Sequence, residues 1–356
     1  MKTTKPKTYK LYFCHEHNEK KRCPICGFLN TKKKGFTAGN ILTTRGLVKR
    51  KIQRYFCHNC NSSFTSNGLN KRKRINDDIK HKNVNDYVVT KNSLSEVSVR
   101  YGISKTSILN WLKEISKEYP LIEDIKCNDN WSGIVLLDGK ETKVKGQRRS
   151  ILIASDAVNR KPILYAKYDR ENINNSRDFL MRLKQLYPVE ITGIISDFGK
   201  GKCFVGVVKQ LFPAVPHQIC LVHFLRYLSM FLPRTKKSKF YWRNKVLRWV
   251  IKKVITAKNK EESLYWFCKF KSWIPFFRAS YHKRFVRSLI MNYDWLTRHY
   301  QYSYLSKNTN VIENTNRQLE RKLKNLDYFK SDYNLNAFLR IWFANYRMKG
   351  ASNRPN

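Results

Sequence analysis

The sequence predicts an α/β protein built from several modules, and three patterns along the chain carry that prediction. Two Cys-x-x-Cys pairs occur within the first 66 residues, a helix–glycine–helix pattern follows, and strands alternating with helices begin near residue 131. A chain of 356 residues is long enough to bury more than one core. We therefore expect a small cysteine-rich module, a helical module and a larger α/β module, in that order.

The chain is strongly basic. Its 71 Lys and Arg outweigh 26 Asp and Glu, which gives a formal net charge of +45. Such a charge destabilises a compact state unless a polyanion neutralises it, and nucleic acid is the polyanion that this composition favours. The aromatic content of 13% argues against a disordered chain. We expect no membrane association and no signal peptide, because no apolar run is long enough for either.

The two Cys-x-x-Cys pairs predict a zinc site. In an intracellular protein such pairs bind metal more often than they form disulfides, and two pairs supply the four thiolates that structural zinc prefers. The long interval between the pairs suits a zinc ribbon, which we assign to residues 1–66 with one structural Zn²⁺. A redox-active pair is the alternative. The expected zinc ligands are Cys23, Cys26, Cys57 and Cys60.

Residues 94–115 predict two helices joined by a sharp turn. Apolar residues recur at helical spacing on both sides of Gly102, and Ser104 can cap the second helix. The pattern is typical of a helix-turn-helix DNA-binding domain, which we place at residues 67–126, although an ordinary helical hairpin would share it. In the DNA-binding motif, the start of the second helix reads base edges. The side chains expected there are Lys105, Thr106, Ser107 and Asn110.

The α/β module follows. Strands are predicted at 134–137, 150–154, 162–166, 189–196 and 215–219, with helices at 175–187 and 200–212. A three-stranded meander followed by helix, strand, helix and strand is the ribonuclease-H-like layout, so residues 127–225 are expected to form the first part of a ribonuclease-H-like catalytic domain.

A basic, aromatic segment interrupts this domain. Residues 226–300 contain 19 Lys and Arg against three acidic residues, and five of the eight tryptophans. The aromatic residues recur at helical spacing, so we expect an all-helical insertion. Residues 301–356 would then complete the catalytic domain with helices at 308–326 and 335–347.

Acidic residues follow two of the predicted strands. Asp138 and Asp197 each come directly after an apolar strand, and Glu313 lies in a predicted helix. Three carboxylates with few other protein ligands suit Mg²⁺, and two such ions can support phosphoryl transfer. An Asp at a strand end is also often a turn former, and Asp156 has the same local pattern. From the residues alone, both interpretations stay open.

Four segments carry a resemblance to a known family. They are Leu136–Gly139, Ile194–Gly201, His217–Phe224 and Asn310–Arg317. In order and composition they resemble the two aspartate strands, the C-x-x-H element and the glutamate helix of the Mutator-like (MULE-type) DDE transposases, including their bacterial and archaeal insertion-sequence relatives. Residues 23–65 are similar to the zinc ribbons that open several such transposases.

The resemblance implies a metal-dependent DNA transposase. Asp138, Asp197 and Glu313 would be the catalytic residues and would hold two Mg²⁺ or Mn²⁺ ions. Cys220 and His223 would have a structural or supporting role beside them, and metal binding by this pair stays open. Glu141, close to Asp138 in the sequence, is a second acid that could confuse the assignment.

The partners follow from the same resemblance. They would be double-stranded DNA, as terminal inverted repeats and as target, and further copies of the chain in a homodimer or higher assembly. Arg317 and Arg321, one and two helical turns beyond Glu313, could hold backbone phosphates. The expected location is the nucleoid-associated cytoplasm of a prokaryote. A domesticated DNA-binding regulator without catalysis and a ribonuclease-H-like nuclease without strand transfer are the alternatives.

Overall fold

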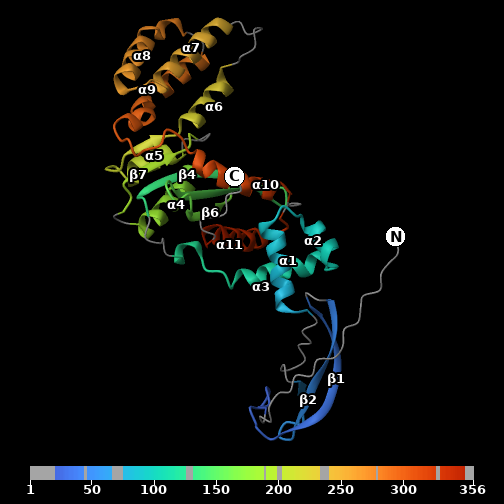
Figure 1. The fold of residues 1–356 in the computed structure, drawn as a ribbon. Helices are drawn as coiled ribbons and strands as arrows, with labels where there is room; N and C mark the ends of the chain where they lie inside the picture. The colour runs from blue at the N-terminus through green and yellow to red at the C-terminus, as the bar shows by residue number, and fades with distance from the viewer. Residues whose placement is uncertain are drawn as a thin grey trace, which may run out of the picture. The chain divides into compact units, whose positions relative to one another are not determined.

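The computed structural model describes most of the chain in two compact units, Met1–Ile115 and Ser116–Asn356 (Figure 1). The described residues are 21–43, 46–65, 75–125, 131–187, 190–198, 203–232, 240–277, 280–325 and 329–348. The first 20 residues and residue 66 of the expected ribbon, and residues 67–74 of the expected helix-turn-helix domain, therefore lie outside the described part.

The first unit begins with a three-stranded antiparallel sheet in the order β1–β2–β3. Its strands are β1 (Thr31–Thr43), β2 (Gly46–Cys57) and β3 (Ser63–Thr65). The long interval between the cysteine pairs is thus a hairpin, with a register shift between Lys33 and Phe36. Among the side chains whose burial is described, the core of this sheet is small: Tyr55 and Phe64 stack beside two of the cysteines. A core of that size needs additional stabilisation.

Three helices complete this unit. They are α1 (Asp77–Val89), α2 (Leu94–Tyr101) and α3 (Lys105–Ser116). The predicted turn is confirmed, because Gly102 ends α2 in the left-handed conformation with φ of 63°. Ser104 caps α3 as expected: its hydroxyl oxygen accepts a hydrogen bond from the Ser107 N–H at 3.1 Å. The apolar face predicted for α3 is buried at Ile108, Trp111, Leu112 and Ile115.

The second unit is built on a five-stranded mixed sheet in the order β6–β5–β4–β7–β8. Its strands are β4 (Ile134–Val144), β5 (Gln147–Asp156), β6 (Pro162–Tyr168), β7 (Gly193–Ser196) and β8 (His217–Ile219). Strands β4, β5 and β6 pair antiparallel, whereas β4, β7 and β8 run parallel. The predicted meander and the two later strands are all present.

Several predicted strand boundaries differ from the structure, and one of them bears on the acidic residues. The apolar run 134–137 was expected to end its strand at Asp138, but β4 continues to Val144. The reason is the antiparallel partner: β5 pairs with β4 as far as Val144↔Gln147 and satisfies the backbone of this polar segment. The parallel neighbour β7 stops earlier, with its last pair at Leu137↔Ser196. Asp138 therefore lies inside a strand, at the point where the parallel pairing ends.

Helices cover the sheet. Helix α4 (Ile173–Leu186) and helix α5 (Cys203–Leu211) share one hydrophobic core with the sheet, in which Phe179 and Phe204 pack against residues of β4, β5 and β6. Helix α11 (Asp332–Met348) is buried along most of its length. The ring of its Phe343 stacks on that of Tyr165 in β6, with 4.2 Å between the ring centres. Helix α10 (Asn310–Asn325) contacts β4.

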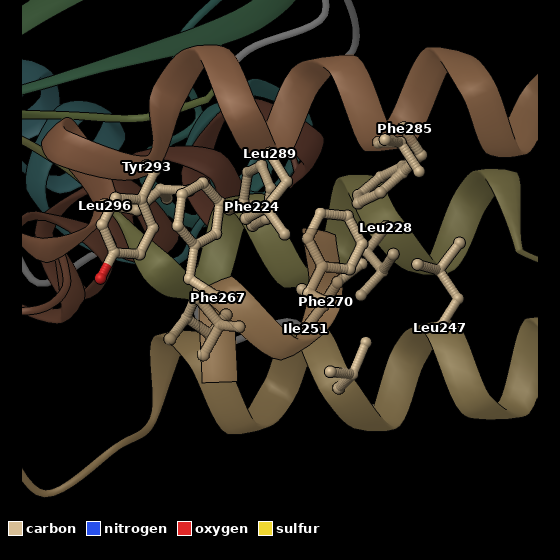
Figure 2. Close-up of a cluster of buried hydrophobic side chains, with 14 of the residues drawn as sticks. Phe224, Leu228, Leu247, Ile251, Phe267, Phe270, Phe285, Leu289, Tyr293 and Leu296 are labelled. Carbon is tan, nitrogen blue, oxygen red and sulfur yellow. The ribbon is translucent and has the colours of Figure 1, made fainter. Parts of the chain in front are cut away.

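The segment between β8 and α10 is helical, as expected. It contains α6 (Leu221–Phe231), α7 (Tyr241–Ile255), α8 (Lys260–Ser272) and α9 (Ser280–Thr297). Figure 2 shows its core, in which aromatic and aliphatic side chains from all four helices meet. Phe267 and Tyr293 stack at 3.8 Å across α8 and α9. Phe198 and Ile219 join the same cluster, so this bundle is packed onto the edge of the sheet.

Across the described part of the chain, no helix combines the length and the apolar character that crossing a bilayer would require.

Candidate active site and metal-binding clusters

The four cysteines of the two Cys-x-x-Cys pairs come together in the first unit. Their sulfur atoms all lie within 4.8 Å of one another. The Cys23 and Cys60 sulfurs are 3.5 Å apart, and those of Cys26 and Cys57 are 3.6 Å apart. A tetrahedral ion with Zn–S bonds of about 2.3 Å would separate its thiolates by about 3.8 Å. The cluster therefore fits a single zinc ion.

The thiols of this cluster differ in acidity. Burial opposes ionisation of Cys23, but backbone N–H groups of the turn, at Cys26 and Ile25, lower the pKa of its thiol to about 6. The N–H of Cys60 lowers the pKa of the Cys57 thiol, yet burial and contact with the neighbouring sulfurs outweigh it and raise that pKa to about 11. Four sulfurs packed this closely can all ionise only if a cation compensates their charge.

A second cluster lies at the end of β7 in the other unit. One oxygen from Asp138, one from Asp197 and a ring nitrogen of His223 lie within 4.8 Å of one another. Asp138 comes from β4, Asp197 follows the last residue of β7, and His223 is in the first turn of α6. The parallel strands deliver these groups to one edge, as expected for the carboxyl ends of neighbouring strands in an α/β sheet. Both carboxylates are buried.

Asp138 is held by its own strand and by α10. Its Oδ1 accepts a hydrogen bond from the Gly139 N–H at 2.8 Å, and its Oδ2 accepts one from the Asn316 side-chain amide. The Lys140 ammonium lies 3.8 Å from Oδ2. These contacts fix the orientation of the carboxylate before any ligand binds.

Several acceptor oxygens around this cluster lack a donor. Asp197 Oδ1, Asn316 Oδ1 and Glu171 Oε1 are buried, and none has a hydrogen-bond partner among the described residues. Buried acceptors are normally paired, because an unpaired one loses the hydrogen bonds that it made to water. A divalent cation supplies what such oxygens need, and carboxylate and amide oxygens are ligands that Mg²⁺ accepts. The residues present therefore fit a divalent cation.

The pKa values of groups in this cluster are strongly shifted, which also favours a functional site. Burial, and then the negative charges of Asp138 and Glu171, raise the pKa of Asp197 well above its usual range. Burial lowers the pKa of His223, but Cys220, Asp197 and Asp138 outweigh that effect and raise it to about 8. Strongly perturbed groups gathered at one strand end are typical of functional sites.

Cys220 and His223 lie beside the two aspartates, and both contact Thr309. Cys220 is buried, and its sulfur accepts hydrogen bonds from the Thr309 N–H at 3.4 Å and hydroxyl at 3.3 Å. The Thr309 hydroxyl also lies 3.4 Å from His223 Nδ1. These contacts link the start of α6 to Thr309, the residue just before α10.

The third predicted acid, Glu313, belongs to α10. The side chains of residues 310–315 lie outside the described part, so its carboxylate is not placed. Its position is three residues before Asn316, which reaches Asp138, and residues three apart lie on the same face of a helix. Arg317 and Arg321, further along α10, are exposed.

The residues predicted to read DNA lie at the start of α3. Lys105, Thr106 and Asn110 are exposed, whereas Ser107 is half-buried and its hydroxyl pairs with that of Ser104 at 2.8 Å. Ser107 therefore contributes to the cap of the helix as well as to its surface.

Asp156 is the turn former that its sequence pattern allowed. It is buried, and its carboxylate accepts hydrogen bonds from the backbone N–H groups of Ser132, Val158 and Asn159. Glu141 is exposed and pairs across the strands with Ser150, away from the cluster. Neither acid competes with Asp138.

Sequence reasoning missed three groups near the acids. Asn316 could have been found, because it lies one helical turn after Glu313 in the segment that carried the resemblance. Thr309 and Glu171 had no signal in the sequence, since only the packing of distant segments brings them to Cys220 and to β4.

Comparisons with known proteins place the chain in a family. The family model described as "Transposase, Mutator family" matches residues 29–349. A curated relative is the transposase for insertion sequence element IS905 from Lactococcus lactis subsp. lactis (strain IL1403), 23% identical over 256 residues. That match covers 69% of this chain and 62% of the relative, so the chain spans less than two thirds of the length of the relative.

Chains of solved structures also match. One of them is a chain of the cryoEM structure of the simian T-cell lymphotropic virus intasome in complex with PP2A regulatory subunit B56 gamma, with 15% identity, covering 47% of this chain and 64% of that chain. The TM-score is 0.23, which is too low to support any conclusion. The family match, by contrast, covers most of the chain, including the acidic cluster and the second cysteine pair, and the chain therefore belongs to the Mutator family of transposases.

Proposed function

We propose that the chain is a DDE-type transposase, which cleaves DNA at the terminal inverted repeats of a mobile element and joins the freed 3′-hydroxyl to target DNA. The observation that carries the proposal is the meeting of Asp138 and Asp197 at the end of β7, among buried oxygens that lack a donor. Glu313, on the helix that contacts Asp138 through Asn316, would complete the catalytic set.

These acids would hold two Mg²⁺ or Mn²⁺ ions. When bound, such ions stabilise negative charge on phosphate oxygens and favour ionisation of an attacking hydroxyl. The chain itself orients the ligands: the Gly139 N–H and the Asn316 amide hold Asp138. Cys220, Thr309 and His223 support the site by linking α6 to the segment before α10.

The fold supports a division of labour that we also propose. A ribonuclease-H-like catalytic domain would comprise residues 127–225 and 301–356, with residues 226–300 as its helical insertion. Residues 1–66 would form a zinc ribbon around one Zn²⁺, and residues 67–126 a helix-turn-helix. The strand order, the cysteine cluster and the Gly102 turn support these assignments.

DNA binding would draw on basic surfaces. The exposed start of α3 suits contacts to base edges and phosphates, and Arg317 and Arg321 suit phosphates close to the acids. The insertion adds exposed aromatic and basic side chains: Trp242 is 69% exposed, with the Lys245 ammonium 4.9 Å from the centre of its ring. Synapsis of two DNA ends would require at least a dimer, in the nucleoid-associated cytoplasm of a prokaryote.

The test is a pair of substitutions on one helix. Glu313→Gln keeps the shape of the side chain but removes the charge that would hold the ions, so cleavage of labelled inverted-repeat DNA should fall on the order of a thousandfold, about 4 kcal/mol in the barrier. DNA binding, measured by gel shift, should remain. The control is Glu320→Gln, because Glu320 lies on the same helix but pairs with Lys324 at 2.7 Å.

Glu320→Gln should cleave and join DNA at near the wild-type rate. Cleavage by Glu313→Gln at the wild-type rate would remove Glu313 from the catalytic set. Binding without any cleavage by the wild-type chain, in Mg²⁺ or Mn²⁺, would favour a DNA-binding regulator. Cleavage without strand joining would favour a nuclease.

A further inference from the structure

Glu171 is an acid beside the catalytic cluster that lies outside the two-aspartate, one-glutamate set. It is in the short segment between β6, which ends at Tyr168, and α4, which begins at Ile173. Burial raises the pKa of its carboxyl group, and the negative charges of Asp138 and Glu141 raise it further. Neither the sequence pattern nor the family resemblance assigns Glu171 a role, so its place in the structure has to be explained by what surrounds it.

The carboxylate of Glu171 lies directly against the backbone of β4. A Cβ atom added at Gly139 would lie 3.0 Å from Glu171 Oε2 and 3.7 Å from its Cδ. Gly139 is in regular pairing with Leu152 of β5, so the strand does not need glycine there for its conformation. Glycine at this position instead leaves space for the carboxylate.

The side chains of Glu171 and Asp138 lie on opposite faces of β4. Successive residues of a strand face opposite sides of the sheet, so Asp138 meets α10 on one side while position 139 meets Glu171 on the other. Strand β7 ends opposite Leu137, and Asp197 follows directly. The Glu171 carboxylate lies outside the group that Asp138, Asp197 and His223 form within 4.8 Å, but it is near enough for its charge to raise the pKa of Asp197.

Glu171 Oε1 is buried and has no hydrogen-bond partner among the described residues, so no donor offsets the burial of this oxygen. We propose that Glu171 is a fourth carboxylate of the divalent-cation site, an inference that rests on the proposed function. Four carboxylates carry four negative charges, which two divalent ions balance. Glycine at position 139 then serves the site by admitting this ligand.

The experiment is a titration of the full-length chain with Mn²⁺, followed by electron paramagnetic resonance, without DNA. Glu171→Gln should weaken Mn²⁺ binding about tenfold or more, the range found when groups supporting a metal site are lost. The matched control is Glu141→Gln, because Glu141 is a nearby but exposed acid on β4. It should bind Mn²⁺ within about twofold of the wild type, since the charge of an exposed side chain is largely screened by solvent and salt.

A melting curve of the metal-free protein separates a ligand from a structural side chain. Glu171→Gln removes a buried charge, so the metal-free melting temperature should rise, while the increase caused by Mn²⁺ should shrink. A purely structural glutamate would give the opposite result, a lower melting temperature with an unchanged Mn²⁺ effect. If Glu171→Gln does not fold, Gly139→Ala provides the test, because it displaces the carboxylate without removing its charge and should also weaken Mn²⁺ binding.

The outcomes distinguish this inference from the proposed function. Asp138→Asn should lose Mn²⁺ binding whether or not Glu171 is a ligand. If Asp138→Asn loses Mn²⁺ while Glu171→Gln and Gly139→Ala bind it like the wild type, the role of Glu171 is overturned and the catalytic set stands. If the wild type and Asp138→Asn bind Mn²⁺ equally weakly, both are overturned.

Discussion

The two candidate metal-binding clusters of this chain are built in opposite ways. The cysteines are a large share of the core described around them, because among side chains of described burial the buried cluster in their sheet contains Tyr55 and Phe64 besides Cys23 and Cys57. The acids lie at the carboxyl end of β7 and on the middle strand β4 of a five-stranded sheet, which has an extensive apolar core of its own. The same kind of event, binding of a cation, should therefore stabilise the fold in the first case and supply chemistry in the second.

The largest effect expected from this difference is in the cysteine cluster. Cys57→Ser removes a buried ligand, so the chain should lose its one tightly bound zinc and the β1–β3 sheet should unfold, because zinc contributes much of the folding free energy of such a module. Elemental analysis and circular dichroism check this result. The exposed Cys268, outside the cluster, provides the control Cys268→Ser, which should keep its zinc. Freshly purified, active wild-type protein without zinc would contradict the assignment.

A smaller effect is expected at Asp156, a buried carboxylate that serves structure alone. Asp156→Asn replaces one acceptor oxygen by a donor facing the Ser132 N–H, so unfolding of the α/β unit should become easier by about 1–3 kcal/mol. Urea denaturation measures this change. Well below its melting temperature the variant should cleave DNA like the wild type, in contrast to Asp138→Asn. Loss of cleavage in a fully folded Asp156→Asn variant would show that a carboxylate paired with backbone N–H groups is not thereby a purely structural one.

The smallest effect concerns pH in the absence of divalent ions. Asp197 has a raised pKa, so the folded chain keeps a proton that the unfolded chain releases, and stability falls as the pH rises above about 4. His223 acts in the same direction: its contribution is complete below about 6.5 and is lost as the pH rises through about 8. One such group changes the unfolding free energy by at most about 1.4 kcal/mol per pH unit.

Mg²⁺ should reverse that trend, because it replaces the proton on the acids. The melting temperature of the α/β unit should therefore increase more on adding Mg²⁺ at pH 8 than at pH 5.5. Differential scanning calorimetry with and without Mg²⁺ measures both values. Asp197→Asn should reduce the difference between the two pH values, and an equal Mg²⁺ effect at both would contradict the role given to Asp197.

The sequence predicts the cysteine cluster more completely than the acidic cluster, because the first depends on local patterns and the second on how distant segments pack. Each Cys-x-x-Cys pair and the Gly102 turn is a local pattern, and the four cysteines come together as their spacing predicts. Asp138 and Asp197 also come together as expected, but β4 ends later than predicted, because the partner strand β5 extends it. The contacts of Thr309 and Glu171 depend on how separate segments pack, and no local pattern encodes them.

Hydrogen exchange of the whole chain, measured by segment before and after all metal is removed with a chelator, tests the contrast between the clusters most directly. Peptides from β1, β2 and β3 should lose their protection without zinc. Peptides from β4, β5 and β7 should stay protected, because the apolar core there is independent of the cation. Unchanged protection of the β1–β3 sheet, or loss of protection in β4 and β7, would contradict the account.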